Sequence, residues 1–498
     1  MSEIILVKLV NLGGEKMENY YEYDKTDSNS IENYTKQLIG KTFRDIINAR
    51  IAKEESGEYN YIENINVKNK GNLGQIVEEN FFGYKINSDP RADFYEAGVE
   101  LKVTPYKINR NGSISAKERL ILTMIDYFSV INETFEDSHL WNKAKLILLI
   151  YYLYEASKES NLDYRIDYVK LFTPPENDVK IIKHDFELIV DKILKGKAHE
   201  LSESDTLYLG AAPKASSSKD RRKQPKSDIL AKPRAFSFKS SYMTYVLNNY
   251  IITEKKNEQI LKTKTDIPFE EYVNRKIAKY IGKSIGELCD IFDLDKKNKP
   301  KHLEAMLAYR ILGIKGNRAE EFEKANIKVK AIRITNKNKI RESMSFPNFE
   351  FQELIEEDWE DSRFANELRE TRFLFIVYKE DVDGNLRLKG SQFWNIPYED
   401  LEYNVKSVWQ KTKDIINEGV KFEIRDNRVL NNLPKAKDNS VCHVRPHASK
   451  SAYKLRHYES GNIDLYASEL PDGQWMTKQC FWLNNTYILS QLNKSFFK

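Results

Sequence analysis

Residues 89–105 read DPRADFYEAGVELKVTP, and the chemistry of the first half of the chain is organised around this stretch. Apolar and polar side chains alternate over residues 99–103, which is the two-residue period of a strand. In such a strand Glu100 and Lys102 lie on one face, and the valine and leucine side chains lie on the other. The pattern therefore predicts a strand that presents a carboxylate and an ammonium group together.

A second carboxylate, that of Asp93, lies seven residues before Glu100. Gly98 stands between them, and a bend at this glycine would bring Asp93 back beside Glu100. Carboxylate oxygens bind hard divalent cations such as Mg²⁺, and a nearby lysine stabilises negative charge on an attacking hydroxide or on phosphoryl oxygens. Asp93, Glu100 and Lys102 are therefore candidate catalytic groups of a metal-dependent phosphodiesterase. The alternative is a surface strand with ordinary charges, because 31% of the chain is charged.

The segments on either side of this strand carry regular patterns. Apolar residues at helical spacing predict a helix over residues 71–83, bounded by glycines. Its acids are Glu78 and Glu79, and one of them is a candidate third metal ligand. Strands are predicted at residues 120–127 and 146–154, and the nine consecutive apolar residues of the second are typical of a buried central strand.

The length and composition indicate a folded protein with more than one domain. For 498 residues, about two to four domains are expected. The 79 basic and 75 acidic residues nearly cancel, so net charge alone does not indicate a nucleic-acid partner. Three scattered cysteines fit a reducing compartment. No run approaches the roughly 18 apolar residues of a membrane helix, and residues 4–10 do not resemble a signal peptide, so a cytoplasmic protein is expected.

Basic side chains are concentrated in residues 214–239, where nine lysines and arginines accompany only Asp220 and Asp228. These basic residues are Lys214, Lys219, Arg221, Arg222, Lys223, Lys226, Lys232, Arg234 and Lys239. A positive, serine-rich loop suits contacts with DNA phosphates, which supply affinity without reading the base sequence. The alternative is a solvated surface loop. Two further lysines, Lys143 and Lys145, stand just before the predicted central strand.

The second half of the chain repeats the first half in the same order. The matched segments are 39–46 with 281–288, 81–83 with 311–313, 94–102 with 322–330, the apolar strand after Lys145 with 373–377, and 212–216 with 445–449. Each match is weak alone, but five matches in one order indicate a duplication. We therefore predict a first domain at residues 1–252, a linker at 253–266 and a second domain at 267–498.

The carboxylates of the first copy are not kept in the second. By this register Glu78 matches Ala308, Asp93 matches Glu321, and Glu100 matches Lys328. A lysine in place of a metal-binding carboxylate removes an anionic ligand and adds a competing positive charge. Basic residues of the second copy that suit DNA binding are Lys330, Arg372, Arg445 and Lys478. We interpret the chain as one cutting copy and one DNA-binding copy.

Together these residues resemble the signature of the MutH-like endonucleases. The likeness rests on GQIVE at residues 74–78, on Asp93 and Phe94, and on GVELKVTP at residues 98–105. More specifically, the chain resembles the duplicated, GATC-cutting type II restriction endonucleases of that group. Further similar segments are FEDSH at 135–139, KAHEL at 197–201, RAF at 234–236, CHVRPH at 442–447 and WMTKQ at 475–479. The resemblance covers nearly the whole chain after residue 31.

The resemblance implies an α/β fold with two tandem restriction-endonuclease-like domains, each with a mixed central sheet flanked by helices, and with a degenerate second copy. It implies Mg²⁺-dependent double-strand cleavage at GATC by the first domain, with 5′-phosphate products. The second domain would bind a second copy of double-stranded DNA as an allosteric effector. A cognate DNA methyltransferase is expected only as a genetic partner, and dimerisation on DNA is left open.

The resemblance also implies roles for individual residues. The metal ligands would be Glu78, Asp93 and Glu100, and Lys102 would be the catalytic lysine. The candidate DNA-binding residues are Lys143, Lys145, Lys214, Arg221, Arg222, Arg234, Lys239, Arg445, His447 and Lys478. The nicking members of the family carry an arginine at the position of Ala212 and a tyrosine at that of Ser237. Base reading in the first half must therefore use other residues.

Two other functions are compatible with parts of the pattern, namely a strand-nicking repair endonuclease of the same fold and a DNA-binding regulator without catalysis. The duplication argues against the first. The acids kept in the first copy argue against the second, because carboxylates repel DNA unless a cation neutralises them. A zinc site is not expected, because the spacing fits no standard ligand set for Cys442, His443, His447 and Cys480.

Overall fold

The computed structural model describes residues 23–55, 72–84, 91–109, 111–215, 217, 219–253, 257–262, 265, 267–295, 302–360, 362–426 and 428–497. The chain divides into two compact units, one formed by residues 1–103 and 146–173 and the other by residues 104–145 and 174–498. The N-terminal run at residues 4–10 and parts of the predicted linker, such as residues 254–256, lie outside the described residues. None of the described helices is long and apolar enough to span a membrane.

The first unit is built on a sheet in which strand β4 lies between β1 and β5. Its elements are α1 (Ser28–Thr35), α2 (Phe43–Glu55), α3 (Asn72–Ile76), the π-helix η2 (Val77–Phe81), β4 (Ile147–Leu153), β5 (Ile166–Phe172) and 3₁₀ turns at Lys36–Leu38 and Asn161–Asp163. Strand β1 (Glu100–Ile108) begins here and continues into the second unit. The first five residues of β4 are buried, which confirms the predicted buried central strand.

The helix that carries Glu78 is irregular. Helix α3 continues into the π-helix η2, instead of forming one regular α-helix over residues 71–83. Gly83 follows with a φ of +73°, a conformation that glycine adopts without strain, so the helix stops where the glycine predicted. Single π turns inside α-helices are rare and occur frequently at functional sites.

The second unit holds the remainder of the first half of the chain. Its elements there are β2 (Ile114–Ala116), β3 (Leu120–Met124), α4 (His139–Ala144), α5 (Glu176–Leu194), β6 (Leu209–Pro213), β7 (Arg222–Gln224), β8 (Ser227–Ala231), β9 (Arg234–Phe238), α6 (Ser240–Val246), the π-helix η7 (Leu247–Ile252) and 3₁₀ turns at Val130–Asn132, Ala198–Glu200 and Glu203–Asp205. Strand β9 lies between β3 and β6 in an antiparallel sheet. The strand predicted at residues 120–127 is confirmed as β3.

The second half of the chain lies entirely in the second unit. Its helices are α7 (Phe269–Ala278), α8 (Ile285–Ile291), α9 (Leu303–Ile311), α10 (Glu320–Lys324), α11 (Phe351–Glu356), α12 (Arg363–Glu370), the π-helix η8 (Asp400–Val405), α13 (Lys406–Glu418), α14 (Ile463–Tyr466), α15 (Asn485–Ser490) and a 3₁₀ turn at Lys494–Phe497. Its strands are β10 (Ile327–Ile334), β11 (Met344–Phe349), β12 (Arg372–Glu380), β13 (Leu386–Trp394), β14 (Phe422–Arg425), β15 (Arg428–Asn431), β16 (Cys442–Pro446), β17 (Tyr453–Leu455), β18 (Tyr458–Ser460), β19 (Ala467–Glu469), β20 (Trp475–Thr477) and β21 (Gln479–Leu483).

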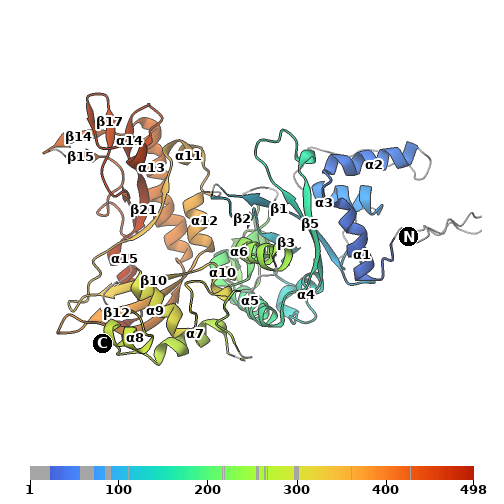
Figure 1. Ribbon diagram of the computed structural model, residues 1–498, viewed down its shortest axis with the longest axis horizontal. Coiled ribbons are helices and arrows are strands. Elements are labelled where there is room, and N and C mark those ends of the chain that lie inside the picture. The colour runs from blue at the N-terminus through green and yellow to red at the C-terminus, as the bar shows by residue number, and fades with distance from the viewer. Residues whose placement is uncertain are drawn as a thin grey trace, which may run out of the picture. The chain divides into compact units, whose positions relative to one another are not determined.

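The strand order of the first half recurs in the second half. The order β1-β4-β5 has its counterpart in β10-β12-β13, and the last two strands are antiparallel in both. The order β3-β9-β6 has its counterpart in β11-β21-β16, with every pair antiparallel. Helix α9 packs against β10 and β12 in the second copy (Figure 1). The fold is thus α/β with two tandem copies, whereas the boundaries at 1–252, 253–266 and 267–498 stay a prediction.

A buried ion cluster joins the two halves within the second unit. Lys324, at the end of α10, places its Nζ 2.7 Å from both carboxylate oxygens of Asp178 and 2.6 Å from Glu320 Oε1. The side chain of Lys324 is 1% exposed. Helix α10 packs beside α6 of the first half (Figure 1). Separating these charges would leave buried carboxylates without their cation, so this contact between the halves is costly to open.

Candidate active site

The loop before β1 returns Asp93 to the start of that strand. The backbones of Phe94 and Val99 exchange two hydrogen bonds, with N···O distances of 2.9 and 3.1 Å. Gly98 turns the chain between them with a φ of +67°, which confirms the predicted bend. The backbone N–H of Leu101 donates to Asp93 Oδ2 at 2.8 Å. Asp93 is therefore held beside the first residues of β1.

Glu100 and Lys102 contact each other on one face of β1. Lys102 Nζ donates to Glu100 Oε1 at 2.6 Å, as the alternation of the sequence predicted. The Glu100 side chain is nearly inaccessible to solvent, with 1% of its surface exposed. The Lys102 side chain is partly accessible, with 22% exposed. The backbone N–H of Glu100 donates to the Leu146 carbonyl at 3.0 Å, next to β4. The pair is thus anchored on the most buried part of the first unit.

Glu78 lies on a third segment, the π-helix η2, and the negative charges of Asp93 and Glu100 raise the pKa of its carboxyl group. Burial raises the pKa of Glu78 to about 7, and the nearby carboxylate of Asp93 is the next largest cause. Glu100 raises this pKa further, while Lys102 opposes the shift. Mutual repulsion between carboxylates in a partly buried place is relieved when a cation binds between them.

A cavity of about 240 Å³ adjoins these acids and is lined by Glu78, Tyr84 and Asp93, among others. Burial raises the pKa of the Tyr84 hydroxyl well above its usual value, and the nearby Asp93 and Glu78 add to the shift. Tyr84 therefore stays protonated and can only donate toward these carboxylates. The cavity is large enough for ordered water or an ion.

The donor chemistry fits a hard divalent cation, although the side chains are not arranged as ligands. Within the part of the chain that the structure describes, no group of three or more acids, histidines or cysteines is close enough together to hold a metal ion. Two of the acids, Glu100 and Asp93, already accept hydrogen bonds within the protein. The Lys102 ammonium bonds to Glu100, and the Leu101 amide bonds to Asp93. A divalent cation would have to replace the first of these contacts.

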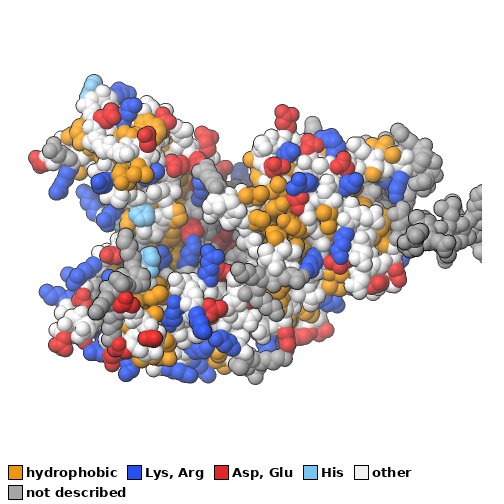
Figure 2. Space-filling view, viewed as in Figure 1, with side chains coloured by type: hydrophobic (Ala, Val, Ile, Leu, Met, Phe, Trp, Pro, Cys, Tyr) orange, Lys and Arg blue, Asp and Glu red, His pale blue; other side chains and the backbone are white. Residues whose placement is uncertain are grey.

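Basic residues of the predicted DNA-binding loop gather on the second unit. Lys214, Arg221 and Arg222 line a surface pocket of about 480 Å³ together with Met124 and Pro233. The Lys214 backbone N–H donates to the Pro233 carbonyl at 2.9 Å, which holds the loop against the start of β9. All three basic side chains are exposed. On the face drawn in Figure 2, lysines and arginines are interspersed with acids, in keeping with the small net charge.

Two residues predicted to contact DNA, Arg234 and Lys239, are buried instead. They are 5% and 3% exposed. Arg234 donates to the Ala211 carbonyl at 2.6 Å, and Lys239 donates to the Thr206 carbonyl. Arg234 lies on β9, the middle strand of its sheet, and Lys239 follows that strand, while their contact with DNA stays a prediction. Lys143 lies in α4, and the exposed Lys145 follows that helix.

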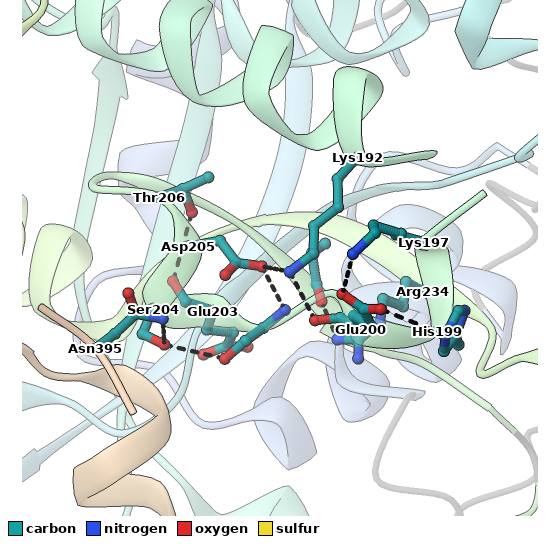
Figure 3. A network of polar contacts seen from close by, with 12 residues as sticks. Lys192, Lys197, His199, Glu200, Glu203, Ser204, Asp205, Thr206, Arg234 and Asn395 are labelled. Atoms are coloured by element: carbon teal, nitrogen blue, oxygen red, sulfur yellow. Dashed lines mark hydrogen bonds and ion pairs between the residues drawn. The ribbon is translucent and has the colours of Figure 1, made fainter. Parts of the chain in front are cut away.

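A polar network links Lys192 to Asp205 and to the Glu200 backbone, beside the segment that contacts the basic hairpin β7-β8 (Figure 3). Lys192 donates to Asp205 Oδ2 and to the Glu200 carbonyl, both at 2.8 Å. The Gln224 side chain, on β7, accepts from the Ala198 backbone at 2.6 Å and contacts His199 Nδ1 at 2.9 Å. The KAHEL segment therefore holds the turn end of the hairpin, which is a positioning role that the sequence did not reveal.

The second copy brings its predicted DNA-binding residues around one aromatic ring. The Arg445 guanidinium lies 4.9 Å from the centre of the Trp482 ring, and His447 packs edge-on against the same ring. The His447 backbone N–H donates to the Lys478 carbonyl at 3.0 Å. Sequence reasoning missed Trp482, and the only available signal was its position three residues after the WMTKQ segment.

Among the described residues of the second copy, two of the three acids have no acidic counterpart, since Ala308 and Lys328 replace Glu78 and Glu100. Lys328 and Lys330 occupy the positions of Glu100 and Lys102, and Lys328 pairs with Glu367. Burial lowers the pKa of Lys330, and the neighbouring Lys328 lowers it further. Glu321, the counterpart of Asp93, accepts from the backbone N–H groups of residues 260 and 261 at 3.0 and 2.8 Å. The second copy is degenerate at this place, as predicted.

Comparisons with known proteins cover the segment of Asp93, Glu100 and Lys102 and, for one relative, nearly the whole chain. The family model of the DNA mismatch repair enzyme MutH matches residues 82–185. The chain is 39% identical over 500 residues to the type II restriction enzyme Sau3AI of Staphylococcus aureus, covering 93% of this chain and 99% of that relative. It is 27% identical over 189 residues to the DNA mismatch repair protein MutH of Vibrio campbellii, covering 37% of this chain and 80% of that relative. The MutH protein of Vibrio vulnificus strain YJ016 is 28% identical over 188 residues.

Proposed function

Because this chain belongs to the MutH-like type II restriction endonucleases, we propose that it cuts both strands of DNA at GATC sites and uses Mg²⁺ held by Glu78, Asp93 and Glu100. Its activity class, a site-specific deoxyribonuclease, follows from the family. The observation that supports metal-dependent cleavage is the placement of Asp93, Glu100 and Lys102 at the start of β1, within electrostatic range of Glu78. A host would need its own sites protected, so a cognate methyltransferase is its expected genetic partner.

In this proposal each charged group has one task. A bound divalent cation would lower the pKa of a water molecule and neutralise phosphoryl charge. Glu78, Asp93 and Glu100 supply the oxygen ligands from three separate segments. Lys102 transfers its hydrogen bond from Glu100 to the phosphoryl oxygen that gains negative charge during attack. Water adds to phosphorus as the 3′ oxygen departs with a proton, which leaves 5′-phosphate and 3′-hydroxyl ends.

The experiment that tests the function is digestion of a supercoiled plasmid with purified protein and Mg²⁺. We expect linear products from a plasmid with GATC sites, ligatable ends that carry 5′-phosphate, and no cleavage in EDTA. A matched plasmid in which each GATC is changed to GTAC serves as the control. Nicked circles that never become linear would instead identify a strand-nicking enzyme. Intact plasmid under all metal conditions would refute cleavage altogether.

For DNA recognition we propose the pocket formed by Lys214, Arg221 and Arg222 in the first copy. Exposed cations at a surface hollow suit phosphate contacts and bidentate contacts to guanine edges. The neighbouring hairpin is held at its turn by the contacts of Gln224 with Ala198 and His199, so the loop does not have to be ordered entirely by DNA.

The second copy, in this proposal, binds another DNA copy through Arg445, His447 and Lys478 and thereby stimulates cutting. The Trp482 ring supports the Arg445 guanidinium, which limits the side-chain freedom that would be lost on binding. Because Ala308 and Lys328 stand at the counterparts of Glu78 and Glu100, this copy can hold DNA without cleaving it. Action in the bacterial cytoplasm is part of the same proposal.

Stimulation by the second copy is expected to depend on Arg445 and Lys478. A plasmid with one GATC site should be cut several-fold faster when a GATC-bearing oligonucleotide is added, because the oligonucleotide fills the effector site. The double variant Arg445→Ala, Lys478→Ala should lose this stimulation and keep the basal rate. Arg456→Ala, at an exposed position of the same copy, is the control. An undiminished response in the double variant would exclude these residues from effector binding.

A further inference from the structure

The hydroxyl of Tyr84 is a buried polar group that no described group of the protein satisfies. Among the residues that the structure describes, it has no hydrogen-bond partner, although its oxygen is shielded from solvent. Buried donors in native proteins are nearly always paired, because an unpaired one loses its hydration without compensation. An orphaned hydroxyl at a cavity therefore indicates that its partner is a group that enters the cavity or turns toward it.

The Tyr84 ring is held in place by its backbone hydrogen bond and by two aromatic neighbours. The residue follows Gly83, and its backbone N–H donates to the Glu78 carbonyl at 3.2 Å. Its ring stacks on Phe82, with centroids 6.1 Å apart, and meets the edge of Phe94 at 5.8 Å. Phe94 is the neighbour of Asp93 in the chain. Tyr84 is thus tied to the segments of two proposed metal ligands, and it lines the same cavity as both.

Of these two ligands, Glu78 is the better acceptor for the hydroxyl. Asp93 already accepts from the Leu101 backbone at 2.8 Å, which fixes its orientation. Glu78 sits in the π-helix, and the backbone bond to Tyr84 spans the turn between them. A carboxylate that gives one oxygen to a metal usually needs a hydrogen bond on the other to hold its orientation.

We propose that Tyr84 is a positioning residue for the metal site, whose hydroxyl donates to the Glu78 carboxylate when a divalent cation is bound. This inference rests on the proposed function, since it assigns a partner to a proposed metal ligand. With a divalent cation bound, one carboxylate oxygen of Glu78 would serve as the metal ligand. The other oxygen would accept the hydrogen bond from the Tyr84 hydroxyl and hold the carboxylate in that orientation. The residue does not touch the scissile phosphate.

The test compares Tyr84→Phe with the unchanged protein by titrating Ca²⁺ calorimetrically in the absence of DNA. We expect a 10- to 100-fold weaker Ca²⁺ affinity, the range typical of lost outer partners of metal ligands. The melting temperature of the metal-free variant should rise or stay equal, because an unpaired hydroxyl has been removed. Cleavage at saturating Mg²⁺ should return to nearly the normal rate, which separates positioning from catalysis.

The matched control is Tyr95→Phe, which alters a tyrosine that lines the same cavity but is 55% exposed and has its hydroxyl 3.2 Å from Glu96. It should leave Ca²⁺ affinity unchanged. Unaltered Ca²⁺ affinity in Tyr84→Phe would overturn the inference, and a cleavage rate that stays low at saturating Mg²⁺ would overturn the positioning role. If the unchanged protein binds Ca²⁺ but cuts no DNA, the proposed function fails while the Tyr84 inference is still decided by the calorimetry.

Discussion

Lys102→Ala is expected to lower the cleavage rate by about 10²- to 10³-fold, because it removes the ammonium group that donates to Glu100 in the acid cluster. The Lys102 Nζ lies 2.6 Å from Glu100 and is partly exposed, so it can approach charge that develops on a phosphate. Without it, that charge forms with less stabilisation. Affinity for the divalent cation should not fall, since the variant removes a competitor for the Glu100 oxygen.

Single-turnover cleavage of a GATC duplex at saturating Mg²⁺ measures this effect, and Ca²⁺ titration measures metal affinity separately. Lys107→Ala is the control, because this lysine lies on the same strand with an exposed side chain. It should cut at the normal rate. Normal cutting by Lys102→Ala would remove Lys102 from the reaction, and a loss explained entirely by weaker metal binding would make it a structural partner of Glu100.

Glu100→Gln is expected to abolish cleavage to below about one part in 10³, since losing several kcal/mol of electrostatic stabilisation costs tenfold for each 1.4 kcal/mol. The amide has almost the size of the carboxylate and still accepts a hydrogen bond from Lys102, so the buried strand end should stay folded. It lacks the negative charge that attracts a divalent cation. In this variant, unlike in Lys102→Ala, Ca²⁺ affinity should fall together with activity.

Calorimetric Ca²⁺ titration and single-turnover cleavage on the same preparation check this expectation. The matched acid is Glu96, which lines the same cavity on an exposed part of the loop, and Glu96→Gln should bind and cut normally. Cleavage by Glu100→Gln at the normal rate would remove the proposed metal site from this strand. If Glu100→Gln keeps its Ca²⁺ affinity but loses cleavage, Glu100 is not a metal ligand and contributes to cleavage in another way.

Local patterns predicted much of the catalytic segment because they depend on near neighbours in the chain. Alternation alone placed Glu100 beside Lys102, and one glycine was enough to predict the return of Asp93. The duplication was visible because both copies kept the order of their segments, and the repeated strand order agrees with it. The helix of Glu78 was only partly foreseen, since no sequence rule distinguishes a π turn from an α turn there.

The number of basic residues in a stretch of sequence does not show which of them are buried. Arg234 and Lys239 belong to the most basic stretch of the chain, yet both lie inside, where they donate to backbone carbonyls. Their composition is that of a DNA-binding loop, but β9 is the middle strand of its sheet and has no free edge. Trp482 escaped prediction for a related reason, because only strand pairing brings it under Arg445.

The sequence by itself determined the family, the doubled α/β architecture, the loss of the acids from the second copy and the strand that carries Glu100 and Lys102. The duplication, the replaced acids and the strand follow from residue type and spacing along the chain, and the α/β architecture follows from the family resemblance. Only the tertiary structure decided which charged side chains face solvent and how far Asp93 raises the pKa of Glu78. It also showed that Tyr84 lines the cavity beside these two acids and that its hydroxyl has no hydrogen-bond partner among the described residues. Such properties depend on burial and on distances between segments far apart in the chain, and no local pattern contains them.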